Sequence, residues 1–170
     1  GWEPEGISEY EVADGEAYHN ALYIKGDIQK PASWHKKSVQ KLIELSIPSI
    51  RDGSLVVDYG SGTGGSAIEL LKELDKRNIR ADLILIDPLV SWFSKARNLL
   101  GSRQNVHFEL SIQKDKYGKL SFRTLENMLG GRRADVIISS STMHLIPKKA
   151  VGDLASQFAG NLKEDGVFIW

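Results

Sequence analysis

Short apolar runs alternate along the chain with longer segments in which apolar residues recur every three or four positions. The apolar residues are consecutive in the runs 55–57, 83–86, 136–138 and 167–169, and a further run, 106–110, has apolar residues at alternate positions. Strands that are apolar on successive residues are covered on both faces, as in a parallel sheet between two layers of helices. The pattern therefore predicts five strands of one mostly parallel sheet.

Helical periodicity fills the segments between these runs. Ahead of the first run, Ser33 stands where it can cap a helix that presents Val39, Leu42 and Ile43 on one face and ends near Pro48. Further helices are predicted over about 66–74, 90–100, 120–129 and 148–162. This alternation predicts an α/β fold that is open, doubly wound and Rossmann-like, with helices on both faces of the sheet.

The first residues differ from the rest of the chain. Residues 1–17 contain six acidic side chains, no lysine or arginine, and neither helical nor strand periodicity. We therefore divide the chain into an acidic N-terminal arm, 1–30, and a core, 31–170.

Composition narrows the choice of function. The chain has 170 residues, 41% of them hydrophobic, which suits one globular domain. Basic and acidic residues balance at 22 each, so nucleic acid is a disfavoured partner. The absence of cysteine excludes disulfides and thiolate chemistry, and no metal site is predicted. With no long apolar stretch and no signal-peptide pattern at Gly1, we expect a cytoplasmic protein without a membrane partner.

A glycine-rich segment follows the first apolar run. Gly60, Gly62 and Gly65 form a Gly-x-Gly-x-x-Gly pattern, which is typical of dinucleotide-binding turns. Asp58 and Gly64 extend it to Asp-x-Gly-x-Gly-x-Gly. A carboxylate there would repel a pyrophosphate and attract an ammonium group. The segment thus predicts a ligand at this turn and disfavours a nicotinamide dinucleotide.

The extended pattern is similar to the first motif of the class I, Rossmann-like S-adenosylmethionine-dependent methyltransferases, and the resemblance runs from about Trp34 to the last residue. It implies that the turn packs against the methionine part of S-adenosylmethionine and that Asp58 helps to hold its ammonium group. The turn residues assigned to this role are Gly60, Ser61, Gly62 and Gly64. In this family the segment before the core often forms a lid. The candidates to line the acceptor site are therefore Tyr10, Tyr18, His19, Tyr23, Trp34 and His35, although such aromatics more often simply pack, and packing is favoured for Trp34.

The second strand also ends in an acid. Asp87 follows Ile86, and a carboxylate there can accept hydrogen bonds from both hydroxyls of a ribose. The resemblance implies this role for Asp87, with Pro88 or Leu89 against the adenine. A helix-capping aspartate is the alternative. Nicotinamide enzymes use the same acid, so Asp87 indicates a nucleoside without choosing between the two families.

The third strand departs from the family pattern, which usually places an acid beside the adenine amino group. Ser111, Ile112 and Gln113 stand there instead. The resemblance then implies that Ile112 packs on the ring and that Ser111 or Gln113 supplies hydrogen bonds; a second option has Asp115 reaching back. Residues 114–119 are simpler to interpret as a solvated loop.

After the fourth run, residues 134–147 resemble the family segment that ends beside the transferred methyl group. The resemblance places Ser139 and Ser140 near the ammonium group, although a run of hydroxyls is also typical of turns. His144 is the candidate general base, because the free imidazole titrates near neutral pH. A histidine that packs at the start of the next helix is the alternative.

The family fold usually continues beyond a fifth strand, whereas this sequence stops at Trp170. We expect a fragment or a short member of the family, with an exposed fifth strand that can associate with another chain. The predicted function is methyl transfer from S-adenosylmethionine to a small-molecule acceptor. The alternatives are an NAD-dependent oxidoreductase and a catalytically silent binding module.

Overall fold

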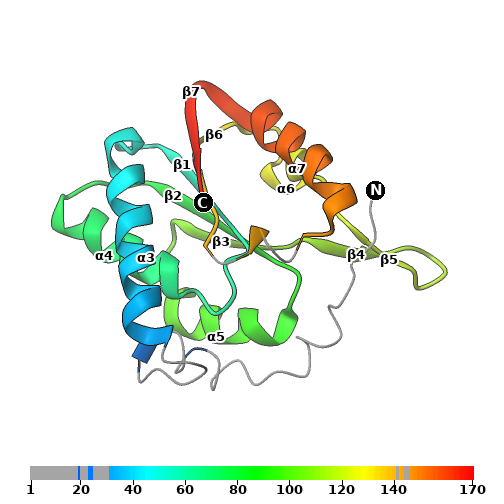
Figure 1. Ribbon diagram of the computed structural model, residues 1–170, viewed down its shortest axis with the longest axis horizontal. Helices are drawn as coiled ribbons and strands as arrows, with labels where there is room; N and C mark the ends of the chain where they lie inside the picture. The colour runs from blue at the N-terminus through cyan, green and yellow to red at the C-terminus, as the bar shows by residue number, and fades with distance from the viewer. Residues whose placement is uncertain (1–18, 20–22, 25–30, 141, 144–145) are drawn as a thin grey trace.

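The protein is described from a computed structural model, shown in Figure 1. The structure describes residues 19, 23–24, 31–140, 142–143 and 146–170. The predicted N-terminal arm therefore lies outside the described residues except for His19, Tyr23 and Ile24.

The core is a five-stranded sheet in the order β3-β2-β1-β6-β7, and every neighbouring pair is parallel. All five predicted strands are present, and the central strand β1 pairs with both β2 and β6. The strands are β1 (Leu55–Tyr59), β2 (Asp82–Asp87), β3 (Val106–Leu110), β6 (Ala134–Ile138) and β7 (Leu162–Ile169). The prediction of a doubly wound, mostly parallel α/β fold is confirmed.

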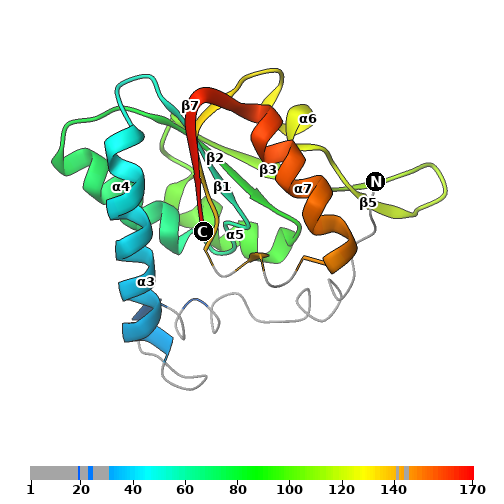
Figure 2. The same ribbon diagram turned by 45° about the horizontal axis from the view of Figure 1, so that its top comes forward.

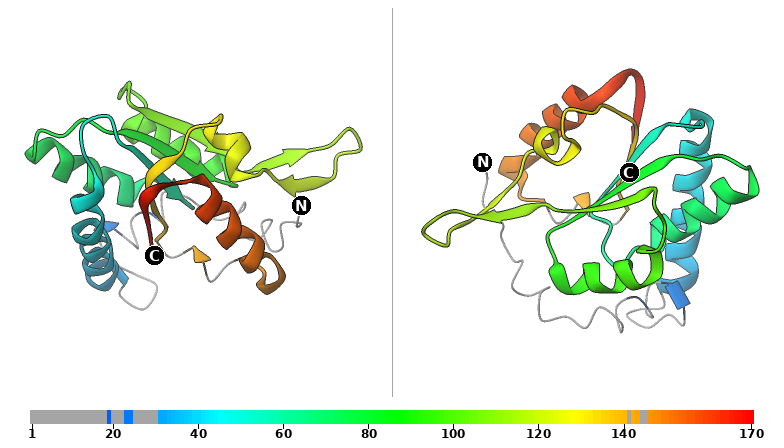
Figure 3. Two further views of the ribbon diagram at one scale, coloured as in Figure 1. Left: turned by 90° about the horizontal axis from the view of Figure 1, so that it is seen from above. Right: turned by 180° about the vertical axis from the view of Figure 1, so that it is seen from behind.

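Two layers of helices cover the sheet, and alternate residues of each strand face opposite layers. Val56 of β1 belongs to the core shared with α3 (Pro31–Ser46), α4 (Gly65–Lys76) and α5 (Val90–Leu100). Leu55 and Val57 belong to the core shared with α6 (Leu125–Leu129) and α7 (Lys148–Asn161). Figure 3 shows these two layers on either side of the strands. Burial on both faces explains why the strand sequences are apolar at consecutive positions.

Two predictions about local structure were wrong. Ser33 does not cap its helix, because α3 begins at Pro31 and includes Ser33; proline suits a first turn, where its missing N–H is not needed. The helix predicted over 120–129 covers only the last five residues. Leu120–Phe122 forms β5, which pairs antiparallel with β4 (Ile112–Lys114), and Thr124 accepts a hydrogen bond from the Asn127 N–H to cap α6. Leu120 and Phe122 are two positions apart, the spacing of a strand and not of a helix.

The fifth predicted strand, β7, lies at one edge of the sheet. Its register against β6 shifts: Ala134 pairs with Leu162, but Val136 pairs with Val167. Between these two pairs β7 has four residues, 163–166, and β6 has one, Asp135, so the irregular part of β7 lies directly after α7. Within the described part of the chain, no strand pairs with the outer edge of β7. Association through this edge stays a prediction.

Phe158 offers a test of how the α7 layer is held. Its ring is 2% exposed, with ring centroids 5.1 Å from Tyr59 and 4.5 Å from Phe168. We expect Phe158→Ala to lower the free energy of unfolding by about 3–5 kcal/mol, because it removes buried apolar area and leaves a cavity. Urea unfolding measures the change. Val151→Ala on the exposed side of the same helix is the control, and an equal loss in the two variants would contradict this account of the packing.

Candidate functional site

The candidate site lies where β1, β2 and β6 end, at the carboxyl edge of the sheet, the edge at which open α/β folds bind ligands. The glycine turn leaves β1 and crosses the end of β2. The N–H groups of Gly60 and Ser61 both donate to the Ile86 carbonyl, at 2.8 and 2.9 Å. The predicted turn and the predicted acid after β2 are therefore brought together by backbone hydrogen bonds.

Gly60 shows why the turn needs glycine. It has a φ of 81°, and a Cβ at this position would collide with the side chain of Thr142. The Thr142 hydroxyl lies within hydrogen-bond distance of the carbonyls of Gly60, 3.2 Å, and Ser140, 3.1 Å. The segment after β6 therefore packs directly on the glycine turn, which agrees with the predicted proximity of Ser140 to this turn.

Asp87 is the polar link between the two loops. One carboxylate oxygen accepts from the Gly62 N–H at 2.8 Å, and the other accepts from the Leu89 N–H at 2.9 Å. Burial raises the pKa of Asp87 to about 6, against the two backbone hydrogen bonds, which lower it. The helix N-cap itself is Leu89, without a side-chain cap, so Asp87 joins two loops and does not cap α5. Its predicted contact with a ribose stays a prediction.

Asp58 lies deeper and is less well paired. Its side chain is 1% exposed, and among the described residues none donates a hydrogen bond to its buried Oδ2 atom. Burial raises the pKa of Asp58 to about 7, and the charge of Asp87 adds to the effect. A buried carboxyl oxygen without a donor is costly, and a cationic ligand would remove that cost. Asp58 and Asp87 thus form a coupled acidic pair at the glycine turn.

The two serines after β6 differ in what they can offer. The Ser139 hydroxyl donates to the Tyr59 carbonyl at 2.8 Å, and the Ser139 N–H donates to the Ile169 carbonyl at 3.0 Å. Ser139 therefore joins the ends of three neighbouring strands. The Ser140 carbonyl faces Thr142. Because the hydroxyl and the N–H of Ser139 both donate to neighbouring strands, only its carbonyl could still contact a ligand.

The end of β3 lies beside Asp87, as predicted for the adenine-binding segment. The Ser111 N–H donates to the Asp87 carbonyl at 3.1 Å, and Ser111 is 1% exposed. Arg123 holds this segment in place: its N–H donates to the Ser111 carbonyl at 2.7 Å, and its guanidinium contacts Glu109 at 2.8 Å. The sequence contained no signal for Arg123, because the hairpin that returns it to β3 was not predicted.

The other residues that were predicted to lie near the adenine differ in how exposed they are. Leu89 is buried, whereas Pro88 and Ile112 are half-buried. Gln113 is exposed and its side chain faces Ser121 across the hairpin at 3.4 Å. The carboxylate of Asp115 accepts from the N–H groups of Tyr117 and Lys119 within its own turn. The option in which Asp115 reaches back to the adenine is therefore wrong.

The N-terminal arm contacts the glycine turn at two described residues. His19 Nδ1 and Thr63 Oγ1 are 2.8 Å apart, and the Tyr23 hydroxyl is 3.3 Å from Ser66 Oγ. The Tyr23 ring lies where a Cβ on Gly65 would be. His19 and Tyr23 thus lie beside the glycine turn, and their role in lining an acceptor site stays a prediction. Thr63 and Ser66 are partners that the glycine motif alone did not indicate.

The remaining aromatic candidates separate into a buried and an exposed residue. His35 is 1% exposed, packs edge-on against Tyr23, and has a pKa lowered by burial. Trp34 is 63% exposed and contacts the His35 ring at 6.1 Å between centroids, so it packs at the surface and not as a buried residue. The candidate base His144 lies outside the described residues. Its role stays a prediction.

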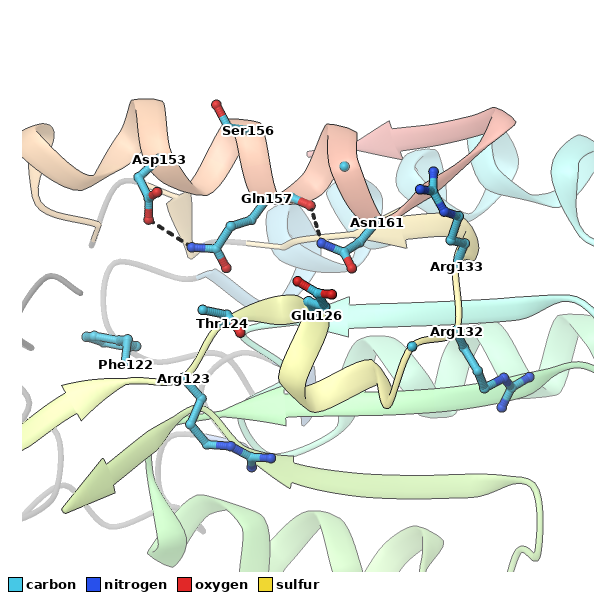
Figure 4. Close-up of a pocket in the computed structure, with 12 residues that line it drawn as sticks. Phe122, Arg123, Thr124, Glu126, Arg132, Arg133, Asp153, Ser156, Gln157 and Asn161 are labelled. Atoms are coloured by element: carbon cyan, nitrogen blue, oxygen red, sulfur yellow. Dashed lines mark hydrogen bonds between the residues drawn. The ribbon is translucent and has the colours of Figure 1, made fainter. Parts of the chain in front are cut away.

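A cavity of about 670 Å³ lies between α6 and α7 and shares no residue with the glycine turn. Figure 4 shows its polar side chains bonded to one another: Gln157 donates to Asp153, and Asn161 donates to the Gln157 carbonyl. The guanidinium groups of Arg123 and Arg132 point away from these amides in Figure 4. This cavity contains neither the glycine turn nor the two buried carboxyls, so it is separate from the candidate site.

Two searches of the described residues were negative. Among them, no group of three or more histidine, aspartate or glutamate side chains is arranged to hold a metal ion. None of the helices formed by these residues combines the length and apolar character required to cross a membrane.

Comparison with known proteins establishes the fold. No family model and no curated protein matches the sequence. Among solved structures, the N-methyltransferase NodS from Bradyrhizobium japonicum, in complex with S-adenosyl-L-homocysteine, has a TM-score of 0.63 and 12% identity over 97% of this chain and 70% of its own. The DhpI-SAM-HEP complex has a TM-score of 0.60 and 16% identity over 95% of this chain and 62% of its own.

The CurJ carbon methyltransferase has a TM-score of 0.60 and 17% identity over 89% of this chain and 40% of its own. The chain thus spans 40 to 70% of the length of these three structures. It has the Rossmann-like fold of class I methyltransferases, and the predicted resemblance is confirmed at the level of the fold.

The buried acidic pair predicts a pH-dependent stability. A carboxyl whose pKa is raised by folding stabilises the protein fully below its unfolded pKa, near 3.8, and this contribution is lost as the pH rises through the folded values of about 6 and 7. We expect the free energy of unfolding to fall by about 1–3 kcal/mol between pH 5 and 8 because of Asp58.

Urea unfolding at several pH values measures this fall, and Asp58→Asn, which cannot ionise, should reduce it. Asp165→Asn, at an exposed position, is the control and should leave the pH dependence unchanged. Identical pH profiles for Asp58→Asn and the unmodified chain would contradict the assignment.

Proposed function

We propose that this chain is the S-adenosylmethionine-binding core of a methyltransferase that acts on a small-molecule acceptor. The observation that supports this most strongly is the buried, unpartnered oxygen of Asp58 at the glycine turn. A donor with positive charge is the group that such an oxygen lacks, and the methionine part of the cofactor carries an ammonium. NodS, whose fold is similar, is described in complex with S-adenosyl-L-homocysteine.

The residues present fit the cofactor by their chemistry. Asp58 would take the ammonium group, Gly60, Ser61, Gly62 and Gly64 would approach the methionine portion, and Asp87 would accept from the ribose. Leu89, Pro88, Ser111 and Ile112 would surround the adenine. Asp87 keeps acceptor capacity beyond its two backbone hydrogen bonds, since a carboxylate offers about four lone-pair sites.

S-adenosylmethionine supplies an electrophilic methyl group, which leaves the protein two main tasks. The chain must hold the acceptor in line with the methyl group and exclude water, and positioning of this kind supplies about 7–11 kcal/mol of a barrier. The arm residues His19 and Tyr23, which contact Thr63 and Ser66, would help to close the site. We propose His144 as general base for acceptors that must lose a proton.

The two alternatives are separated by different observations. A pyrophosphate at the glycine turn would meet the carboxyl of Asp58, which disfavours the NAD-dependent oxidoreductase. A silent binding module is consistent with the lack of an acid at Ser111, Ile112 and Gln113. A screen of methyl acceptors separates the module from an enzyme, because only the enzyme forms S-adenosylhomocysteine.

Titration with S-adenosylhomocysteine tests the proposed site. We expect Asp87→Ala to weaken binding by about 1.5–3 kcal/mol, the usual value of hydrogen bonds to a charged group. Isothermal titration calorimetry gives the affinity. Asp82→Ala is the matched control, because Asp82 lies at the opposite end of the same strand and pairs with Arg132 at the surface.

The control should bind S-adenosylhomocysteine like the unmodified chain. Asp87→Asn keeps one carbonyl oxygen as an acceptor and should lose less affinity than Asp87→Ala. Unchanged affinity in Asp87→Ala would refute the role of Asp87. Tighter binding of NAD than of S-adenosylhomocysteine would refute the proposed function.

A further inference from the structure

The hairpin after β3 stands apart from the main sheet. In the part of the chain that the structure describes, its strands β4 and β5 pair with each other and with no other strand, in register from Ile112 opposite Phe122 to Lys114 opposite Leu120. Figures 1 and 2 show it as an arm that projects from the body of the molecule. Because β3 runs parallel to β1 and β2, this arm extends beyond the same edge of the sheet at which Asp58 and Asp87 lie.

The tip of this arm is a well-bonded turn. The carboxylate of Asp115 accepts from the N–H groups of Tyr117 at 2.8 Å and Lys119 at 2.9 Å. The backbone adds two bonds, from the Asp115 N–H to the Lys119 carbonyl and from the Gly118 N–H to the Asp115 carbonyl, both at 3.0 Å. Gly118 has a φ of 81°, which suits glycine. The side chains at the tip are therefore presented from a defined backbone.

The tip exposes a cationic and aromatic surface. The tip contains three lysines, Lys114, Lys116 and Lys119, and one acid, Asp115. The Asp115 carboxylate already accepts hydrogen bonds within its own turn. Within the described part of the chain, neither Lys114 nor Lys116 forms an ion pair. Tyr117 is 82% exposed, and the Lys116 ammonium lies 4.9 Å from its ring centroid. Tyrosine rings are enriched at contact surfaces, and the neighbouring lysines give this one a positive charge.

We propose that the tip of the β4–β5 hairpin is a docking site for an acidic protein surface. Charge complementarity identifies the partner, since carboxylates would pair with Lys114 and Lys116 while Tyr117 packs against apolar atoms between them. Nucleic acid fits less well: the chain has no net charge, and a single short arm does not provide the extended row of cations that follows a phosphate backbone. A docked partner would lie beside the cofactor-binding edge.

Fluorescence anisotropy with a short, fluorescein-labelled poly-L-glutamate peptide tests the docking site at low ionic strength. We expect the double variant Lys114→Glu/Lys116→Glu to weaken binding by about tenfold or more, because it reverses the two charges that would pair with the partner. Tyr117→Ser keeps the net charge and should also weaken binding. The control Lys36→Glu/Lys37→Glu makes the same charge change on exposed residues of α3 and should have a much smaller effect.

Several outcomes would overturn the proposal. Equal losses in the tip variant and the α3 control would indicate diffuse attraction without a site, and an unmodified chain that does not bind the peptide would exclude docking of this kind. Tip-dependent binding of single-stranded oligo-dT that is tighter than that of the peptide would assign the arm to nucleic acid. Calorimetric affinity for S-adenosylhomocysteine should be unchanged in the tip variant, so this test and that of the proposed function fail independently.

Discussion

The carboxylate of Asp87 connects the parts of the site that come from different strands. It receives hydrogen bonds from Gly62 in the first loop and Leu89 in the second, while its backbone carbonyl receives one from Ser111 after β3. Without this acceptor, two buried N–H groups would lose their partner, at a cost of about 1–3 kcal/mol each. The glycine turn and the start of α5 therefore depend on one buried carboxylate, and the end of β3 is joined to the same residue through its backbone carbonyl.

That arrangement places a second carboxyl, that of Asp58, where burial and the neighbouring Asp87 disfavour its charged form. It is buried beside Asp87, one of its oxygens has no donor, and its pKa is raised to about 7. The cost of this position is tolerable if a cation completes the site, and stability and ligand affinity are then in opposition at the same residue. A residue that lowers the stability of the free protein in order to bind a ligand is typical of binding sites.

The strands, the two helix layers and the glycine turn could be predicted because each depends on local information. Consecutive apolar residues such as Val56 and Val57 must be covered on both faces, whatever the strand order. The hairpin at 112–122 could not be predicted from periodicity, since its strands are three residues long and their pairing depends on the turn at Asp115. The helical interpretation of 120–129 failed for the same reason.

By itself, the sequence determined an α/β fold with a ligand-binding turn after its first strand, because apolar periodicity and glycine spacing act over short distances along the chain. Tertiary structure decided which groups meet there: Asp87 with Gly62, Tyr23 with Ser66, and Arg123 with Ser111. It also decided that Asp58 lacks a partner and that Asp115 turns toward its own hairpin. Hydrogen bonds between residues distant in sequence require a defined strand order, which local patterns do not specify.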